Sequence, residues 1–102
     1  LDVACALNYL KQRMLIHRDV LARNCLVTSK NVVKLAEFGK AIFGYKIRGR
    51  DIAVAQRYVA AEVLRKAQFS HASDIWSFGV LIWQVFHNAA TPYDDLYDIK
   101  EV

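Results

Sequence analysis

The stretch from Ile75 to Phe86 constrains the fold most strongly, because its apolar side chains cover nearly the whole circumference of the helix that it predicts. Ser73 precedes this stretch and can cap a helix over residues 74–87. A helix that is apolar on all sides avoids water only where other elements surround it. The sequence therefore predicts a central helix, with Trp76 and Trp83 as core side chains rather than as parts of a binding site.

The size of the chain limits how much of this apolar surface a core can bury. A chain of 102 residues is enough for one small domain, whose surface is large relative to its volume. Its hydrophobic fraction of 55% and its mean hydropathy of +0.12 are high for such a domain. We therefore expect one core, and additional apolar surface that partner segments cover.

Shorter patterns predict the elements around the central helix. Residues 1–14 have apolar side chains at alternating steps of four and three, which predicts an amphipathic helix with Val3, Leu7, Leu10 and Met14 on its buried stripe. Residues 25–38 hold two short apolar runs around a polar turn, which predicts a β-hairpin. Residues 39–59 show no sustained period and predict an irregular loop. The expected fold class is mainly α with one small β-hairpin.

The loop from His17 to Asn24 combines several charged and polar residue types between two apolar segments. Asp19 supplies a carboxylate, and Asn24, five positions later, supplies a neutral amide oxygen. Phosphoryl transfer can use the carboxylate to accept the proton of a hydroxyl group and the amide to bind a Mg²⁺ ion. Residues 17–24 are therefore a candidate catalytic loop.

Three further motifs follow this loop along the chain, and the four together resemble the protein kinase family. The three motifs are Glu37-Phe38-Gly39 at the end of a predicted strand, Ala60-Ala61-Glu62, and Ser73–Gly79 at the start of the central helix. In this family the corresponding segments bind metal, close the activation segment and support the catalytic loop. The resemblance implies a partial kinase C-lobe, with a catalytic loop at 17–24, an activation segment at 39–62 and a central helix at 74–87.

Two segments resemble the tyrosine kinase type of this family. Residues 22–27 read Ala-Arg-Asn-Cys-Leu-Val, and serine/threonine kinases usually have a lysine where Leu21 stands. Residues 57–60 resemble the segment that receives the substrate side chain in tyrosine kinases. The resemblance therefore implies ATP-dependent phosphoryl transfer to a tyrosine of a protein or peptide substrate.

The resemblance also implies roles for residues around the reacting groups. Asp19 would orient the substrate hydroxyl group and accept its proton, with Arg23 as the second catalytic residue. Asn24 would bind the second Mg²⁺ ion, and Glu37 would occupy the principal metal position. Leu26 would contact ATP. The implied cofactors are thus ATP and Mg²⁺.

A second group of residues has regulatory or structural roles by the same resemblance. Arg18 would bind a phosphotyrosine through charge-assisted hydrogen bonds, and Tyr45 is the best candidate for phosphorylation. An alternative for Arg18 is a surface salt bridge, and an alternative for Tyr45 is an ordinary exposed aromatic. The expected structural residues are His17, Phe38, Gly39, Glu62 and Asp74.

Several positions depart from the kinase pattern. Glu37 stands where the family has an aspartate, and its extra methylene moves the carboxylate outward by about 1 Å in a site that needs tight octahedral geometry. Ala61 stands where the family has a proline, which removes a fixed φ angle. The 102 residues contain no G-x-G-x-x-G motif and cover less than half of a kinase domain. We therefore expect a fragment that is inactive in isolation and that packs against the other kinase segments.

Two alternatives and some exclusions remain from the sequence. The chain could be a pseudokinase-like scaffold whose basic segment, residues 40–66 with seven basic and two acidic residues, recruits an acidic or phosphorylated partner. It could also be a designed sequence with no selected function. The sequence argues against nucleic-acid binding, because Phe43 and Tyr45 are the only aromatic side chains that could stack on bases among the basic residues at positions 40–50 of this segment. With no membrane segment, no cleavable signal, and two cysteines expected to be buried and reduced, the expected location is cytoplasmic.

Overall fold

The computed structural model describes residues 2–49, 54–87 and 92. Its α-helices are α1 (Asp2–Gln12), α2 (Ala61–Lys66) and α3 (His71–Phe86), and its 3₁₀ helices are η1 (Ala22–Asn24) and η2 (Gln56–Tyr58). Its strands are β1 (Leu15–Ile16), β2 (Cys25–Val27), β3 (Val33–Leu35), β4 (Ile42–Phe43), β5 (Lys46–Arg48) and β6 (Gln68–Ser70). The strands form the antiparallel pairs β1–β4, β2–β3 and β5–β6.

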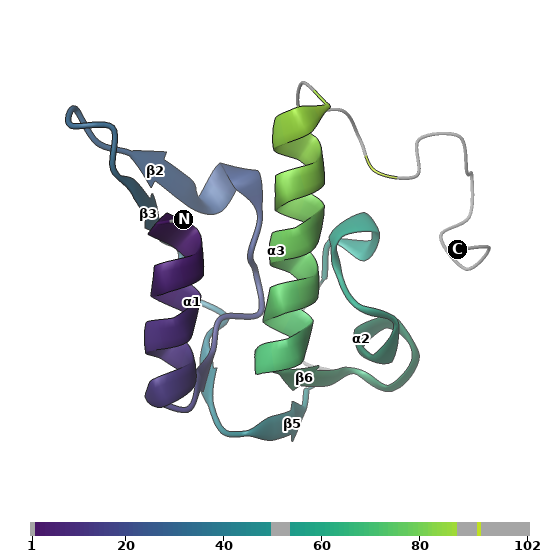
Figure 1. The fold of residues 1–102 in the computed structure, drawn as a ribbon. Coiled ribbons are helices and arrows are strands. Elements are labelled where there is room, and N and C mark those ends of the chain that lie inside the picture. Colours follow the sequence, from purple (N-terminus) through teal and green to yellow (C-terminus); the bar gives the residue numbers. More distant parts are fainter. Residues whose placement is uncertain (1, 50–53, 88–91, 93–102) are drawn as a thin grey trace.

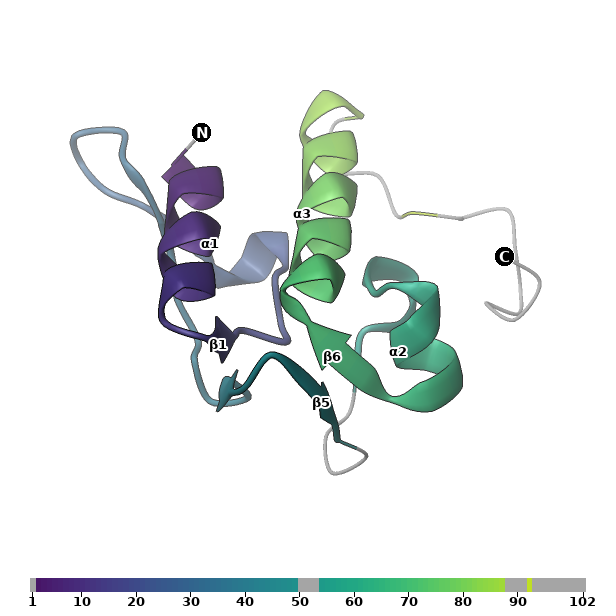
Figure 2. The same cartoon turned by 60° about the horizontal axis from the view of Figure 1, so that its bottom comes forward.

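Helices α1 and α3 run side by side in opposite directions, with β2 and β3 beyond one end of α1 and β5, β6 and α2 around the start of α3 (Figure 1, Figure 2). The predicted stripe of α1 is confirmed at Val3, Leu7 and Leu10, which are buried. Met14 was wrongly included, because α1 ends at Gln12 and Met14 takes a positive φ of 57° with its side chain exposed.

Apolar side chains form two buried clusters, so the expectation of a single core was wrong. The first cluster joins α1 to α3 and consists of Val3, Leu7, Leu10, Val20 and Leu81. The second lies between β1, α2 and β6 and consists of Ile16, Ala60, Val63 and Phe69. Leu81 of α3 belongs to the first cluster, and α3 begins directly after β6, whose Phe69 belongs to the second.

Helix α3 begins three residues earlier than predicted. Ser70, in extended conformation at the end of β6, is the N-cap, and its Oγ accepts the backbone N–H of Ser73 at 3.3 Å. The Ser73 hydroxyl in turn accepts the backbone N–H of Ser70 at 3.0 Å. Ser73 is therefore the other half of a capping box rather than the cap itself. At the other end, His87 caps the helix after Phe86.

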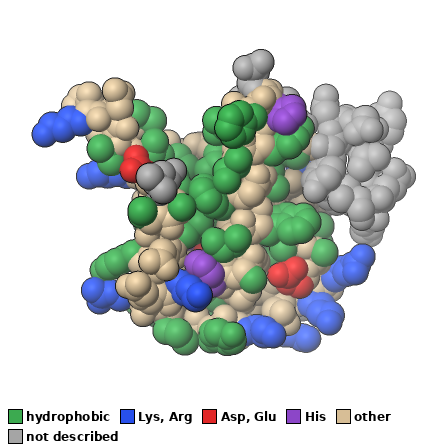
Figure 3. Space-filling model, viewed as in Figure 1, with side chains coloured by type: hydrophobic (Ala, Val, Ile, Leu, Met, Phe, Trp, Pro, Cys, Tyr) green, Lys and Arg blue, Asp and Glu red, His purple; other side chains and the backbone are tan. Residues whose placement is uncertain are grey.

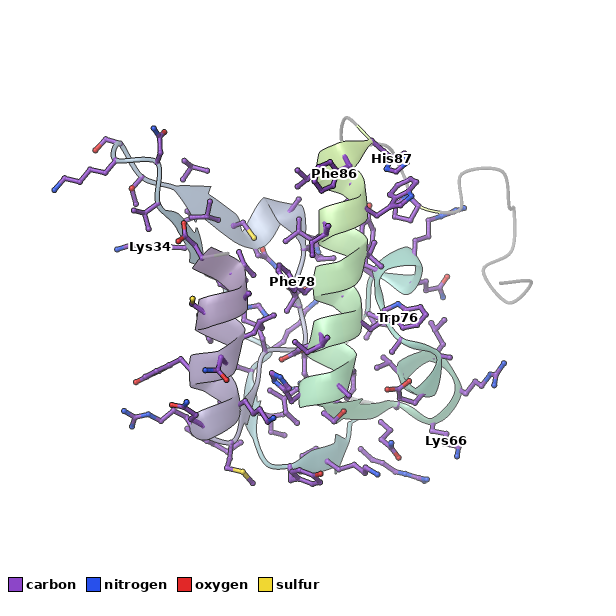
Figure 4. The ribbon with its side chains drawn as sticks, in the orientation of Figure 1. Lys34, Lys66, Trp76, Phe78, Phe86 and His87 are labelled. Carbon is purple, nitrogen blue, oxygen red and sulfur yellow. The ribbon has the colours of Figure 1, made fainter. Side chains whose placement is uncertain are left out.

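Helix α3 has exposed apolar side chains on more than one side within the described residues. Trp76 and Phe86 are 47% and 79% exposed, so the prediction of a helix surrounded on all sides does not hold within this part of the chain. Trp76 and Trp83 line a groove of about 430 Å³ together with Gly79, Val80 and Pro92, so they were wrongly predicted as core. Figure 4 shows Trp76 and Phe78 pointing to opposite sides of α3, with Phe78 on the side of α1. The excess of apolar surface inferred from composition is present here.

The hairpin predicted at 25–38 is confirmed as β2–β3, with Val27 opposite Val33. The prediction of an irregular loop at 39–59 was wrong in part, because β4 pairs with β1 and β5 pairs with β6, while residues 50–53 lie outside the described part. The described residues therefore contain three short strand pairs instead of one. Cys25 is half-buried, whereas Cys5 is exposed and not buried as expected. None of the described helices combines the length and the hydropathy that a membrane crossing requires.

Candidate catalytic loop site

His17 fixes the candidate loop to α3 through the backbone. This residue follows β1 and is fully buried. Its backbone N–H donates to Oδ2 of Asp74 at 2.8 Å, and the backbone N–H of Arg18 donates to Oδ1 of the same carboxylate at 3.0 Å. Arg18 has a φ of 71°, a left-handed conformation that is costly for a side-chain-bearing residue. The Asp74 carboxylate therefore holds the loop in a conformation that the loop does not favour by itself.

The His17 ring connects the loop to the end of β3. Its Nε2 lies 2.8 Å from the carbonyl oxygen of Ala36, and its Nδ1 accepts the backbone N–H of Asp19 at 3.1 Å. A carbonyl oxygen only accepts and a backbone N–H only donates, so this arrangement fits the neutral ring with its proton on Nε2. The ring of Phe38 packs edge-on against His17, with centroids 4.8 Å apart.

Burial raises the pKa of Asp74 above its ordinary value of 3.8. The hydrogen bonds from His17 and Arg18 act in the opposite direction, because they stabilise the ionised carboxylate. Asp74 is almost completely buried, so the two backbone N–H donors replace the hydrogen bonds that water would make to its carboxylate.

The Arg18 side chain lies inside the molecule and not on its surface. Its Nε donates to the carbonyl oxygen of Lys40 at 2.6 Å, and its guanidinium lies 5.0 Å from the centre of the Phe69 ring. Only 9% of Arg18 is exposed, which rules out a solvated surface salt bridge. Tyr45 is 76% exposed and lies between β4 and β5.

Asp19 follows in the loop with a carboxylate that two cations approach. Its side chain is 12% exposed, and its oxygens lie 3.8 Å from Arg23 and 3.7 Å from Nζ of Lys40. Sequence reasoning assigned Arg23 to the site but missed Lys40. The only signal for Lys40 was its position directly after Glu37-Phe38-Gly39.

Asn24 is buried at the end of η1. Its Nδ2 donates to the carbonyl oxygen of Asp19 at 2.7 Å, which leaves Oδ1 as its ligand atom. The carbonyl oxygen of Asn24 accepts the backbone N–H of Ala36 at 2.7 Å, so the loop and the strand end before Glu37 are held together. The structure thus brings Asp19, Asn24 and the 36–38 segment into one network.

Glu37 lies at the end of this network with a φ of 61°, and its side chain is exposed. Together, the Asn24 amide oxygen and the Glu37 carboxylate are the oxygen donors that Mg²⁺ prefers, so the residues fit this ion in chemical type. The described part of the chain contains no group of three or more His, Cys, Asp and Glu side chains that could hold a metal ion. A Mg²⁺ ion here therefore needs further ligands, such as water and phosphate oxygens.

The remaining predicted residues lie apart from this network. Leu26 is on β2 with an exposed side chain, and Gly39 is exposed in the turn after β3. Glu62 is in the first turn of α2, which packs on the second apolar cluster.

Comparisons with known proteins cover nearly the whole chain. The family model described as protein tyrosine and serine/threonine kinase matches residues 1–102. The spermatocyte protein spe-8 of Caenorhabditis elegans is 40% identical over 92 residues, which are 89% of this chain and 18% of that protein. Fer-related kinase 1 of the same nematode is 35% identical over 100 residues, 97% of this chain and 26% of that protein. The tyrosine-protein kinase transforming protein Fps of avian sarcoma virus (strain PRCII) is 38% identical over 99 residues, 93% of this chain and 19% of that protein. The chain therefore spans about a fifth to a quarter of the length of these relatives.

Proposed function

Because the chain belongs to the protein tyrosine and serine/threonine kinase family, we propose that it supplies the catalytic loop and activation segment of a protein-tyrosine kinase. The reaction is ATP-dependent phosphoryl transfer to a tyrosine of a protein or peptide. Two relatives that the chain resembles are named as kinases, and one of these as a tyrosine-protein kinase. The tyrosine-type sequence of residues 22–27 and 57–60 supports this substrate class.

One observation carries the proposal, namely the fixed position of Asp19 in the candidate loop. Its backbone N–H is bound by the ring of His17, and its carbonyl oxygen is bound by Asn24. The carboxylate is mostly shielded from water and faces Lys40 and Arg23. In the proposed reaction Asp19 orients the tyrosine hydroxyl group and accepts its proton, while the two cations offset the negative charge around it.

Asn24 and Glu37 are the residues that would hold Mg²⁺ on the ATP phosphates. The ion, when bound, neutralises negative charge on the phosphates. Glu37 offers the right donor atom on a side chain one methylene longer than aspartate, so we expect weaker activity than with aspartate. Leu26 is proposed to contact the nucleotide through its exposed apolar side chain. Arg18 is proposed to bind a phosphate on Tyr45 after phosphorylation, which requires its guanidinium to become accessible.

We propose that the 102 residues alone do not transfer phosphate. They contain no glycine-rich phosphate loop, so most groups that position ATP lie elsewhere in a kinase. The exposed apolar side chains of α3 are proposed to pack against those other kinase segments, since burial of Trp76 and Phe86 would remove a large apolar area from water. A cytoplasmic location is part of the same proposal, because ATP is available there.

The test is a chimaera in which residues 1–102 replace the matching segment of Fer-related kinase 1, since the two align over 100 residues. Transfer of radiolabelled phosphate from ATP to a tyrosine-containing peptide is measured in the presence of Mg²⁺. We compare the chimaera with its Glu37→Asp variant, and with Asp19→Asn as the inactive control. The isolated chain is assayed in parallel.

We expect Glu37→Asp to raise kcat by on the order of a hundredfold, and the isolated chain to give no signal above the blank. An Asp19→Asn chimaera as active as its parent would remove Asp19 from the catalytic role. If Glu37→Asp leaves a well-folded chimaera inactive, the scaffold function gains support over a weakened enzyme. Robust transfer by the isolated chain would contradict its proposed inactivity.

A further inference from the structure

A second surface of the chain carries positive charge outside the catalytic loop. It consists of Lys46 and Arg48 on β5 and of Arg65 and Lys66 in the last turn of α2, and we call it the cationic face. All four side chains are exposed. In Figure 3 the basic side chains gather along the lower right edge of the molecule, and Figure 4 places Lys66 at that edge.

Backbone pairing brings the two halves of the cationic face together. Arg48 is the register partner of Gln68, and the backbone N–H of Gly49 donates to the carbonyl oxygen of Ala67 at 3.0 Å. Ala67 directly follows Lys66 and has a left-handed conformation that ends α2. Residues some 20 positions apart in the sequence are therefore neighbours.

The side-chain alternation of β5 turns its charges outward. Ile47 packs against the second apolar cluster. Because successive side chains of a strand point to opposite faces, Lys46 and Arg48 lie on the face away from that cluster. Both residues are exposed, in agreement with this alternation.

Acidic residues around these cations are few. Over residues 46–49 and 54–70 the only acidic residue is Glu62, in the first turn of α2. Within the described ranges, none of the four basic side chains has a hydrogen bond or an ion pair to another residue. Like charges that are close together repel one another, and an anionic partner relieves this repulsion.

We propose that the cationic face binds an acidic segment of a partner protein, with clustered Asp and Glu carboxylates as the recognised groups. Arg48 and Arg65 offer planar guanidinium groups that can bind a carboxylate through two parallel hydrogen bonds. In the described part of the chain, β6 is the only strand that pairs with β5. In the proposed complex an extended peptide adds a strand at the other edge of β5 and places its acidic side chains beside Lys46 and Arg48. A nucleic acid or a lipid surface has no peptide backbone that could pair with this edge.

The probe is a fluorescein-labelled peptide of eight glutamates, and binding to the chain is followed by fluorescence anisotropy at about 50 mM and about 200 mM salt. Arg48→Glu combined with Lys66→Glu reverses one charge on each half of the cationic face. Lys30→Glu combined with Lys34→Glu makes the same change of net charge on the β2–β3 hairpin. Figure 4 shows Lys34 and Lys66 on opposite sides of the molecule. Circular dichroism checks that both variants keep the wild-type fold.

We expect the wild-type chain to bind the octaglutamate, more weakly at the higher salt concentration. The reversal on the cationic face should weaken binding at least about tenfold, and the hairpin reversal by less than about threefold. Equal losses in the two variants would show attraction by net charge alone and would overturn the proposal, as would an absence of binding at the lower salt concentration.

Two comparison ligands test the class of partner. An eight-nucleotide RNA and vesicles with phosphatidylserine carry comparable negative charge, and tighter binding of either one than of octaglutamate would overturn the assignment to a protein partner. If Arg48→Glu combined with Lys66→Glu unfolds the chain, Arg48→Gln combined with Lys66→Gln replaces it. The glutamines remove the two positive charges without adding negative ones. This binding needs no phosphoryl transfer, so its loss and the loss of kinase activity are distinguishable.

Discussion

The carboxylate of Asp74 accepts the backbone N–H of His17 at 2.8 Å, across 57 positions of the sequence. With its second oxygen it accepts the backbone N–H of Arg18. One side chain of α3 thereby fixes two consecutive amides of the candidate catalytic loop, directly before Asp19. The position of the proposed base therefore depends on the start of α3 as much as on the loop itself.

Removal of this carboxylate should destabilise the chain. In Asp74→Asn the amide can accept only one of the two backbone N–H groups, and the other loses its partner in a buried site. We expect the free energy of unfolding at neutral pH to fall by about 1–3 kcal/mol, and by more in Asp74→Ala. Urea denaturation measures the change. Glu37→Gln changes an exposed carboxylate and serves as the control, with an expected effect within about 0.5 kcal/mol; equal effects at the two positions would contradict the anchoring role.

Asp74 should also give the stability a pH dependence of defined sign. Burial raises its pKa in the folded state above the ordinary value of 3.8, so the folded chain holds this proton more tightly than the unfolded chain does. Between these two pKa values, a rise in pH therefore lowers the free energy of unfolding. The wild type should lose stability relative to Asp74→Asn as the pH rises from about 4 toward neutrality. Urea denaturation at a series of pH values measures this difference, and a relative gain would show that the backbone N–H donors outweigh burial.

Two glycines should respond to alanine in opposite ways. Gly44 has a φ of 151°, and a Cβ there would lie 2.5 Å from Cδ1 and Cγ1 of Ile47, so Gly44→Ala should destabilise the chain by about 1–3 kcal/mol. Gly79 lies within α3, and a Cβ there would meet no atom within 4 Å. Gly79→Ala should stabilise the chain by about 0.5–1 kcal/mol through helix propensity. Thermal denaturation of both variants provides the comparison, and a stabilised Gly44→Ala would contradict the geometry of the β4–β5 connection.

His71 should report the contact between α1 and the start of α3. Burial lowers its pKa below the ordinary 6.5, the positive charge of Lys11 lowers it further, and the charge of Asp74 opposes both effects. Lys11→Met should therefore raise the pKa of His71, which an NMR titration of its ring protons can follow. Lys30→Met, on the hairpin, removes the same charge and should leave this pKa unchanged. An unchanged value in Lys11→Met would mean that Lys11 does not face His71.

The sequence predicted the parts of the fold that depend on strong local patterns. The stripe of Val3, Leu7 and Leu10 and the hairpin within residues 25–38 were correct, because apolar spacing and turn composition determine them directly. The cap of α3 was misplaced because Ser70 and Ser73 both suit an N-cap, and only the extended backbone of β6 distinguishes them. Strands of two or three residues, such as β4 and β5, are too short for any periodicity to appear.

The candidate site was predictable where motif residues themselves make the contacts. Asp74 and His17, both named from their motifs, contact each other through the backbone N–H of His17. Contacts to backbone carbonyl groups, such as the hydrogen bond from the His17 ring to the carbonyl oxygen of Ala36, cannot be predicted from residue type, because every residue has a carbonyl group. The position of Lys40 beside Asp19 also depends on the path of the chain after β3 and not on a pattern. The exposure of Trp76 was not predicted, because the hydrophobicity of a helix does not show which other elements pack against it.

The pairing of Lys46 with Ser70 joins two parts of the chain that motifs describe separately. Ser70 ends β6 and caps α3, so release of β5 from β6 removes the strand that pairs with the N-cap residue of α3. Local opening of the segment after β4 should therefore include this turn as one cooperative unit. Amide hydrogen exchange would show matching protection at residues 46–48 and 68–73. A rearrangement of β5 would then be transmitted to Asp74, and through it to the loop that carries Asp19.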